Sequence, residues 1–328
     1  MALIPVTILT GFLGSGKTTL LNHILKSQHG WRIAVIENEF GEVGIDNDLL
    51  VQNQDEQIIE MNNGCICCTV RGDLVRILGE LAVKKKAGQL KFDHVVIETT
   101  GLADPAPVAQ TFFVDDDVMQ NYMLDAVVTL VDAVHAPQQL TDHHEAQEQV
   151  GFADRVLITK TDLVTPDDVS ALRQRLSRIN PRAKISQAVH GVAAVDELID
   201  IRGFNLNAIL DIEPDFLQDV THHHDDDITS FVFSEPRAMD LVRVEDFLGG
   251  IVQVFGAQML RYKGVLNIHD EPHRIVFQGV HMLMGADKGA AWNPNESRAS
   301  KIVFIGKNLP RHVFEKGLLT CVAQASTN

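Results

Sequence analysis

The sequence predicts an α/β fold, a parallel β-sheet covered by helices, followed by a smaller α+β domain. Three observations support this fold class. Near-continuous apolar runs alternate with helical patterns over residues 1–205. A glycine-rich stretch joins the first apolar run to the first helical pattern. The pattern changes after a polar run, which indicates a second domain of different architecture.

The apolar runs of the first domain are expected to form buried parallel strands, because parallel strands are covered on both faces and lack alternation. Helical patterns lie between most of them, for example Leu74, Ile77, Leu78 and Leu81. Ligands are expected at the carboxyl ends of these strands. The predicted strands are Ile4–Leu9, Arg32–Ile36, Gln57–Met61, His94–Ile97, Ala126–Val131, Arg155–Ile158 and Lys184–Ala188.

The domain boundaries follow the change of pattern. Residues 1–205 form the first domain, residues 206–228 a linker, and residues 229–328 a smaller α+β domain with mostly antiparallel strands. The linker contains His222–Asp227, a run of histidines and aspartates that either binds metal or is simply solvated. The last domain is predicted to contain, in order, strand Thr229–Phe233, helix Val244–Phe255, strands Leu260–Ile268, His273–Gln278 and Lys301–Ile305, and helix Arg311–Leu319.

Composition limits the possible functions. The chain has 328 residues, 45% of them apolar, and a formal net charge of −16. No dense basic stripe is available to displace counterions, so nucleic-acid binding is not expected. No transmembrane run or signal peptide is evident, so no membrane association is expected and the cytoplasm is the predicted location. The 4 cysteines are too few for a disulfide framework in so long a chain.

A complete phosphate-binding loop, G-x-x-x-x-G-K-T, spans Gly11 to Thr18 between a predicted strand and a predicted helix. Its backbone N–H groups and the helix N-terminus would face an anion. Lys17 would reach the β- and γ-phosphates, and Thr18 would hold Mg²⁺. The alternative is a glycine-rich turn without a ligand. The phosphate-binding residues predicted by the motif are Gly11, Phe12, Leu13, Gly14, Ser15, Gly16, Lys17 and Thr18.

Two later strand ends complete the features of a nucleotide site. Glu98 ends an apolar strand, where an acid can reach the Mg²⁺ shell, and the N–H of Gly101 can sense a γ-phosphate. Thr159, Lys160 and Asp162 follow another strand, and a carboxylate there can accept hydrogen bonds from guanine N1–H and its 2-amino group. The alternatives are a solvated strand end and an ordinary turn before a helix.

Two further segments predict a metal site. Glu37–Glu42 carries three carboxylates, which repel one another unless a cation lies nearby. We favour a segment that meets Mg²⁺ or a second metal over a solvated acidic loop. Cys65, Cys67 and Cys68 follow a strand just before a helix, where thiolates are favoured and bind Zn²⁺ or Cu(I). Glu37 or Glu42 can complete such a site; the alternatives are buried cysteines or a redox pair.

These motifs together resemble the CobW-type GTPases, metal-handling relatives of the nickel GTPases of hydrogenase and urease. The resemblance rests on the segments GFLGSGKTT, ENEFGEV, NGCICC, ETTG and TKTD, and on LRYKG near residue 262. It covers nearly the whole chain. The resemblance implies GTP hydrolysis coupled to delivery of a metal, often zinc or cobalt. It implies that Gly11 to Thr19, including Thr19 itself, bind the phosphates and that Lys160 and Asp162 bind guanine. It also implies that Glu37, Glu42 and Cys67 bind the transition metal.

The sequence therefore favours a GTP-hydrolysing metallochaperone that uses GTP, Mg²⁺ and Zn²⁺ or Co²⁺, with Lys17 and Glu98 as catalytic residues. Its expected partners are GTP or GDP, a transition metal ion and an unknown client metalloprotein, with a nucleotide- or metal-dependent homo-oligomer as a further possibility. One alternative is a metal buffer or sensor with incidental hydrolysis, and another is a small-molecule kinase. His143 and His144 lie in a predicted helix and are expected to be merely solvated.

Overall fold

The computed structural model divides the chain into two compact units, Met1–Ser177 with Arg182–Gly203 and Arg178–Pro181 with Phe204–Asn328. It describes residues 3–27, 30–37, 57–60, 66–189, 192–193, 195, 198–201, 203, 227–293 and 296–323, of which residues 37, 57–60 and 66–71 are described by their backbone alone. Most of the predicted linker, including His222–His224, lies outside these residues. In the described part of the chain, no helix is long and apolar enough to cross a membrane.

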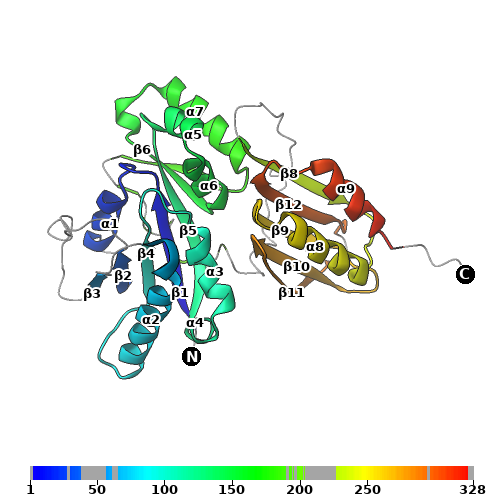
Figure 1. Ribbon diagram of the computed structural model, residues 1–328, viewed down its shortest axis with the longest axis horizontal. Coiled ribbons are helices and arrows are strands. Elements are labelled where there is room, and N and C mark those ends of the chain that lie inside the picture. The colour runs from blue at the N-terminus through cyan, green and yellow to red at the C-terminus, as the bar shows by residue number, and fades with distance from the viewer. Residues whose placement is uncertain are drawn as a thin grey trace, which may run out of the picture. The chain divides into compact units, whose positions relative to one another are not determined.

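The first unit contains a seven-stranded parallel sheet in the order β3-β2-β4-β1-β5-β6-β7 (Figure 1). This confirms the predicted parallel sheet. β1 is central, with β4, β2 and β3 on one side and β5, β6 and β7 on the other, so its carboxyl end is where the strand order reverses and ligands typically bind. The strands are β1 (Ile4–Gly11), β2 (Ile33–Glu37), β3 (Gln57–Glu60), β4 (His94–Glu98), β5 (Tyr122–Asp132), β6 (Arg155–Thr159) and β7 (Lys184–Ala188).

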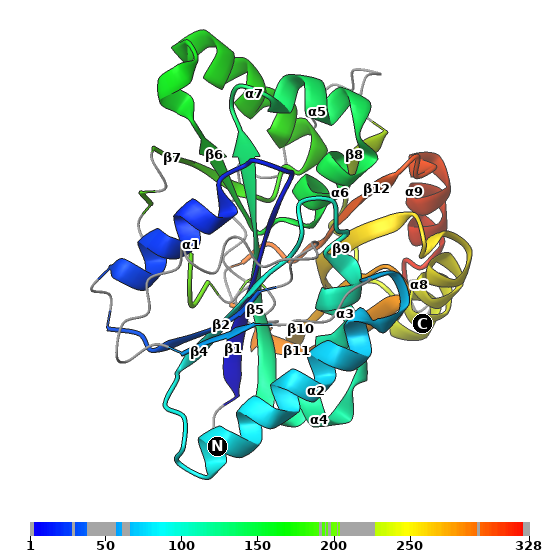
Figure 2. The same cartoon turned by 60° about the vertical axis from the view of Figure 1, so that its left-hand side comes forward.

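Helices cover both faces of this sheet. Figure 2 shows α1 on one side of the strands and α2, α3 and α4, which pack against one another, on the other side. The apolar face of α1 packs on β1, β2 and β4 through Leu20, Leu21, Ile24 and Leu25. The helices are α1 (Lys17–Lys26), α2 (Ile66–Lys86), α3 (Ala106–Val114), α4 (Asp116–Asn121), α5 (Ala136–Asp142), α6 (His144–Phe152) and α7 (Pro166–Ile179), with a 3-10 turn η2 (Thr161–Leu163).

The described part of the second unit is a five-stranded antiparallel sheet in the order β11-β10-β9-β12-β8, with two helices. The predicted smaller domain with antiparallel strands is thus confirmed. Its core gathers aromatic side chains, among them Phe231, Tyr262, Phe304 and Phe314. The elements are β8 (Ile228–Glu235), α8 (Leu241–Phe255), β9 (Met259–Leu266), β10 (His273–Val280), β11 (Leu283–Ala291), β12 (Ser300–Lys307) and α9 (Arg311–Thr320).

Strand β11 was not predicted from the sequence. Its residues include Gly285, Ala286, Asp287, Lys288 and Gly289, types that are depleted in strands. Most of them are exposed, because β11 is an edge strand paired only with β10. An edge strand buries too little side-chain surface to leave an apolar alternation in the sequence, so backbone pairing alone defines it.

Candidate nucleotide site at the carboxyl ends of the central strands

The glycine-rich loop between β1 and α1 has the geometry of a phosphate cradle. Gly16 caps α1 with a left-handed φ of 98°, which a residue with a side chain rarely adopts. Gly11 has no room for a side chain, because an added Cβ would lie 2.5 Å from the carbonyl oxygen of Leu130. These constraints explain both glycines of the motif and leave the N-terminus of α1 facing the strand ends.

Lys17 is held at the mouth of this loop. Its Nζ donates to the carbonyl oxygens of Gly11 at 2.8 Å and of Phe12 at 3.4 Å, and the residue is only 9% exposed. Burial lowers the pKa of the Lys17 ammonium, and the negative charge of Glu98 opposes this shift. Because carbonyl oxygens hold the ammonium in place, it needs no large movement to meet a phosphate.

The end of β4 is tied directly to the phosphate loop. The backbone N–H of Thr99 donates to the carbonyl of Leu9 at 3.0 Å, and the Thr99 hydroxyl donates to the Thr10 hydroxyl at 2.8 Å. Beyond it, Gly101 lies so close to Leu13 that an added Cβ would be 2.7 Å from the Leu13 nitrogen. The structure thus brings Glu98 and Gly101, both predicted from sequence, to the edge of the loop.

The predicted base-recognition segment also contacts the phosphate loop. The Thr159 hydroxyl donates to the carbonyl of Ser15 at 2.8 Å, and Lys160 Nζ donates to that of Gly14 at 2.9 Å. Lys160 has a left-handed φ of 56°, a conformation that non-glycine residues often adopt at functional sites. Asp162 is exposed in η2, so its carboxylate is accessible to a base.

Asp132 is a site residue that the sequence reasoning missed. This carboxylate, 1% exposed at the end of β5, accepts hydrogen bonds from Lys160 Nζ at 2.6 Å, from His135 Nδ1 at 2.9 Å and from the N–H of Val134 at 2.9 Å. Burial alone would raise the pKa of Asp132, but these hydrogen bonds hold it below its usual value. The signal was present, because Asp132 ends an apolar strand as Glu98 does.

His143 is exposed, as expected, but it also makes a ring contact that the sequence did not predict. It immediately precedes α6, and its ring lies 4.7 Å from the ring of Phe12, with the two planes inclined by 32°. The sequence could not reveal this contact, because it joins the phosphate loop to a helix from a distant part of the chain. Phe12, the second residue of the phosphate loop, thereby packs against a residue from outside the loop.

The structure describes only part of the predicted metal site. Glu42 and Cys65 lie outside the described residues, and Glu37 is described only as the backbone end of β2. α2 begins at Ile66, so Cys67 and Cys68 lie in its first turn rather than before it as expected. Among the side chains that the structure describes, no group of three or more His, Cys, Asp or Glu residues could hold a metal.

The backbone register nevertheless places one predicted metal residue beside the nucleotide site. Glu37 is the register partner of Glu98 across the pair β2 and β4, and Glu98 is in turn the register partner of Leu9 in β1. On its other side, Glu37 pairs with Glu60 of β3. Three glutamates therefore end three adjacent parallel strands.

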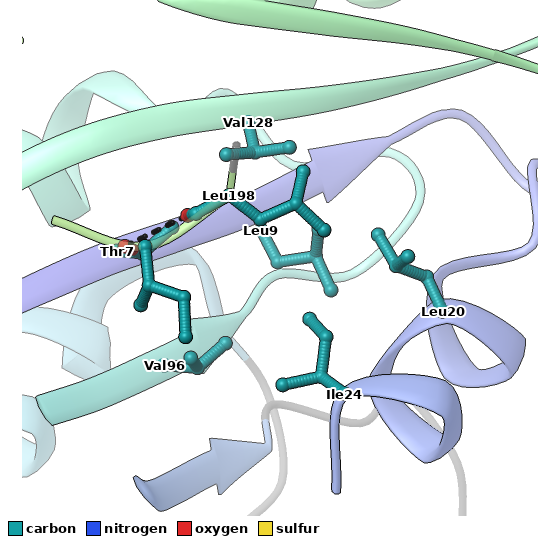
Figure 3. Close-up of a pocket in the computed structure, with 8 residues that line it drawn as sticks. Thr7, Leu9, Leu20, Ile24, Val96, Val128 and Leu198 are labelled. Atoms are coloured by element: carbon teal, nitrogen blue, oxygen red, sulfur yellow. Dashed lines mark hydrogen bonds between the residues drawn. The ribbon is translucent and has the colours of Figure 1, made fainter. Parts of the chain in front are cut away.

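A cavity under α1 is not a ligand site. Figure 3 shows it between α1 and strands β1, β4 and β5, lined by Leu9, Leu20, Ile24, Val96 and Val128, with Thr7 at one end. Its volume of about 10 Å³ is close to the space needed for one water molecule, and its walls are almost entirely apolar. The nucleotide site therefore lies at the strand ends, outside this core.

Comparison with known proteins agrees with this geometry. The model of the "CobW/HypB/UreG, nucleotide-binding domain" matches residues 5–187, and that of the "Cobalamin synthesis protein cobW C-terminal domain" matches residues 228–322. Both β1 with its phosphate loop and the end of β6 fall within the first match.

Individual relatives share nearly the whole chain. The zinc chaperone YjiA of Escherichia coli is 44% identical, with 94% of this chain and 95% of the relative covered. Zinc-regulated GTPase metalloprotein activator 1 of Schizosaccharomyces pombe is 31% identical, with 94% and 83% covered. The crystal structure of Zn(II)-bound YjiA GTPase from E. coli matches with a TM-score of 0.82 at 37% identity, with 98% of this chain and all of that chain covered. The chain therefore belongs to the CobW/HypB/UreG family, as its sequence motifs predicted.

Proposed function

We propose that this chain is a Mg²⁺-dependent GTPase that binds zinc beside its nucleotide site and delivers it to a client metalloprotein. The names of its relatives support this proposal, since one is a zinc chaperone and another a zinc-regulated GTPase metalloprotein activator. The single observation that carries it is the register of β2 with β4, because it sets Glu37 next to Glu98.

The nucleotide half of the mechanism follows from the described side chains. Lys17, already held by loop carbonyls, neutralises charge that develops on the transferring phosphoryl group. The first N–H groups of α1 bind phosphate oxygens. Asp162 accepts hydrogen bonds from guanine, and Lys160 fixes this segment to the phosphate loop.

The donor types at the site suit Mg²⁺, which prefers oxygen ligands. The fit rests on Glu98, whose charge is felt by the buried ammonium of Lys17, and on Thr18 in the first turn of α1. When bound, Mg²⁺ would supply charge neutralisation to the phosphates, with Thr18 and Glu98 holding it. Thr18 already has its carbonyl fixed by the side-chain amide of Asn22 at 3.1 Å, which steadies this turn.

Zinc is the cargo in this proposal, with Glu37, Glu42, Cys65, Cys67 and Cys68 as its candidate ligands. Thiols in the first turn of a helix have lowered pKa values, which favours the thiolate that binds zinc. β2 would position Glu37 for zinc, and the adjacent β4 positions Glu98 for Mg²⁺. A shift at one strand end is therefore felt at the other, so the two ligands should influence each other.

The test is a competitive zinc titration with a non-hydrolysable GTP analogue and then with GDP. The expected difference in zinc affinity is about 5- to 150-fold, and zinc must change nucleotide affinity by the same factor because linkage is reciprocal. Co²⁺ loading should also give sulfur-to-metal charge-transfer absorption. Cys67→Ser should remove this band and the coupling.

Cys321→Ser is the matched control for this titration, because Cys321 is a buried thiol of the second unit whose Sγ–H lies 3.4 Å from the carbonyl of Arg243. It should change neither the absorption band nor the coupling. Equal zinc affinities in the two nucleotide states would instead favour a metal buffer whose hydrolysis is incidental.

A further inference from the structure

Gln149 is a buried residue of α6 that joins this helix to the segment after β4. Its side-chain Nε2 donates to the carbonyl oxygens of Gly101 at 3.2 Å and of Ala103 at 3.1 Å. The residue is 1% exposed. One amide group thus satisfies two backbone acceptors of a loop that precedes it by more than forty positions in the chain.

The helix that carries Gln149 is fixed to the sheet. The Thr129 hydroxyl donates to the backbone carbonyl of Gln149 at 2.8 Å. Thr129 in turn is the register partner of Thr10, the residue that precedes the phosphate loop. His143, which immediately precedes α6, contacts Phe12, so this helix and its N-cap residue touch both the phosphate loop and the segment after β4.

The segment itself is a tight turn. The N–H of Ala103 donates to the carbonyl of Thr100 at 3.1 Å, and Gly101 lies against Leu13 of the phosphate loop. Because a peptide group is planar, its orientation is fixed when its carbonyl is hydrogen-bonded. Ala103 fixes the peptide before Gly101 and Gln149 fixes the one after it.

We infer that Gln149 is a positioning residue for GTP hydrolysis, whose amide holds the turn 100–103 against the phosphate loop so that Gly101 meets the γ-phosphate. This inference rests on the proposed role of Gly101 and does not involve zinc. GDP lacks the γ-phosphate, so its binding should not depend on the turn. Loss of the amide should therefore act on the triphosphate alone.

The test is Gln149→Met, which keeps an unbranched side chain of similar length and removes both donors. We expect kcat for GTP and the affinity for a non-hydrolysable GTP analogue to fall about tenfold, which corresponds to the net value of about two neutral hydrogen bonds, while GDP affinity is unchanged. A merely structural role would lower thermal stability and leave the ratio of the two affinities as it was.

Gln147→Met is the matched control. Gln147 lies on the same helix, is 3% exposed, and donates through Nε2 to the carbonyl of Leu140 at 2.7 Å, away from the turn. The same substitution there should leave the affinity ratio and kcat unchanged. If the two variants behave alike, or if Gln149→Met keeps the parent ratio, the inference is overturned.

Gln149→Asn decides the matter if Gln149→Met does not fold. It keeps the amide but is one methylene shorter, so the nitrogen cannot reach both carbonyls. The same selective loss is expected, and an unchanged ratio overturns the inference. All measurements are made without zinc, so their outcome is independent of the zinc titration, and a loss of coupling there would leave this result intact.

Discussion

The two halves of the parallel sheet differ in how the charged residues at their carboxyl ends are paired. On the side of β5 and β6, Thr159 and Lys160 bind carbonyls of the phosphate loop, and the buried carboxylate of Asp132 pairs with Lys160 at 2.6 Å. On the side of β4, β2 and β3, the strands end in Glu98, Glu37 and Glu60 at neighbouring register positions.

The difference shows which half of the sheet balances its own charges. The β5–β6 half pairs its charges internally, because Lys160 binds both the Asp132 carboxylate and the carbonyl of Gly14. The other half places carboxylates on adjacent strands, an arrangement that favours bound cations because like charges repel. We therefore expect nucleotide binding to survive without a transition metal, whereas the binding of cations should depend on the nucleotide.

The largest expected effect comes from Lys17→Ala, which removes the cation of the phosphate loop. Single-turnover GTP hydrolysis should fall about a thousandfold, because a donor to the developing charge is lost. Lys26→Ala, at the exposed end of the same helix, should retain the parent rate. Undiminished turnover by a folded Lys17→Ala protein would contradict the assignment of the phosphate site.

Asp162→Asn tests whether the β6 end reads the base. The preference for GTP over ATP should fall roughly 10- to 100-fold, because an unmatched donor costs on the order of 1–3 kcal/mol and tenfold is about 1.4 kcal/mol. Competition binding measures it, and Asp167→Asn in the exposed first turn of α7 serves as the control. Equal affinity of the unmutated protein for both nucleotides would refute guanine recognition.

Asp132→Asn tests the internal pairing of the β5–β6 half. Lys160 loses its counter-charge, so GTP and GDP affinities should fall together by about tenfold while their ratio stays constant. Calorimetric titration checks both, and the exposed Asp142→Asn is the control. A change confined to GTP would show that Asp132 acts on the γ-phosphate instead.

The same carboxylate predicts a pH dependence. The pKa of Asp132 is depressed in the folded protein, so its stabilising contribution is present above the ordinary carboxyl value of 3.8 and is lost as pH falls through the lower folded value. Nucleotide affinity should therefore show no change due to Asp132 between about pH 8 and pH 5.

A further prediction concerns His94, at the opposite end of β4 from Glu98. Burial lowers the pKa of His94 to about 3, against the charge of Asp200. In the unfolded chain His94 binds a proton near pH 6.5, whereas in the folded protein it binds one only near pH 3. The free energy of unfolding therefore falls as pH drops through this window, by up to about 1.4 kcal/mol per pH unit.

His94→Gln should flatten this dependence in urea unfolding at pH 7.5, 6 and 5, and leave nucleotide affinity at pH 7.5 unchanged. The hydroxyl of Thr7, 2.8 Å from His94 Nε2, retains a polar partner in this variant. The exposed His144→Gln should unfold with the parent's pH dependence. The same slope in His94→Gln as in the parent would contradict the assignment.

The sequence by itself determined the strands of the parallel sheet, the phosphate loop and the family. These features are encoded in contiguous residues, since apolar runs define buried strands and the spacing from Gly11 to Thr18 defines the loop. It also predicted Glu98, Gly101, Lys160 and Asp162 as site residues, because each lies at or just after the end of a strand at the same edge of a parallel sheet, and their roles stay predictions.

Only the tertiary structure decided which residues support that site. Gln149 contacts a turn that precedes it by more than forty positions, and His143, just before α6, lies against Phe12. Asp132 pairs with Lys160 across neighbouring strands, and β11 is defined by pairing rather than by pattern. Such contacts have no local signature, because a buried amide or an exposed edge strand acquires its role from the neighbours that folding brings to it.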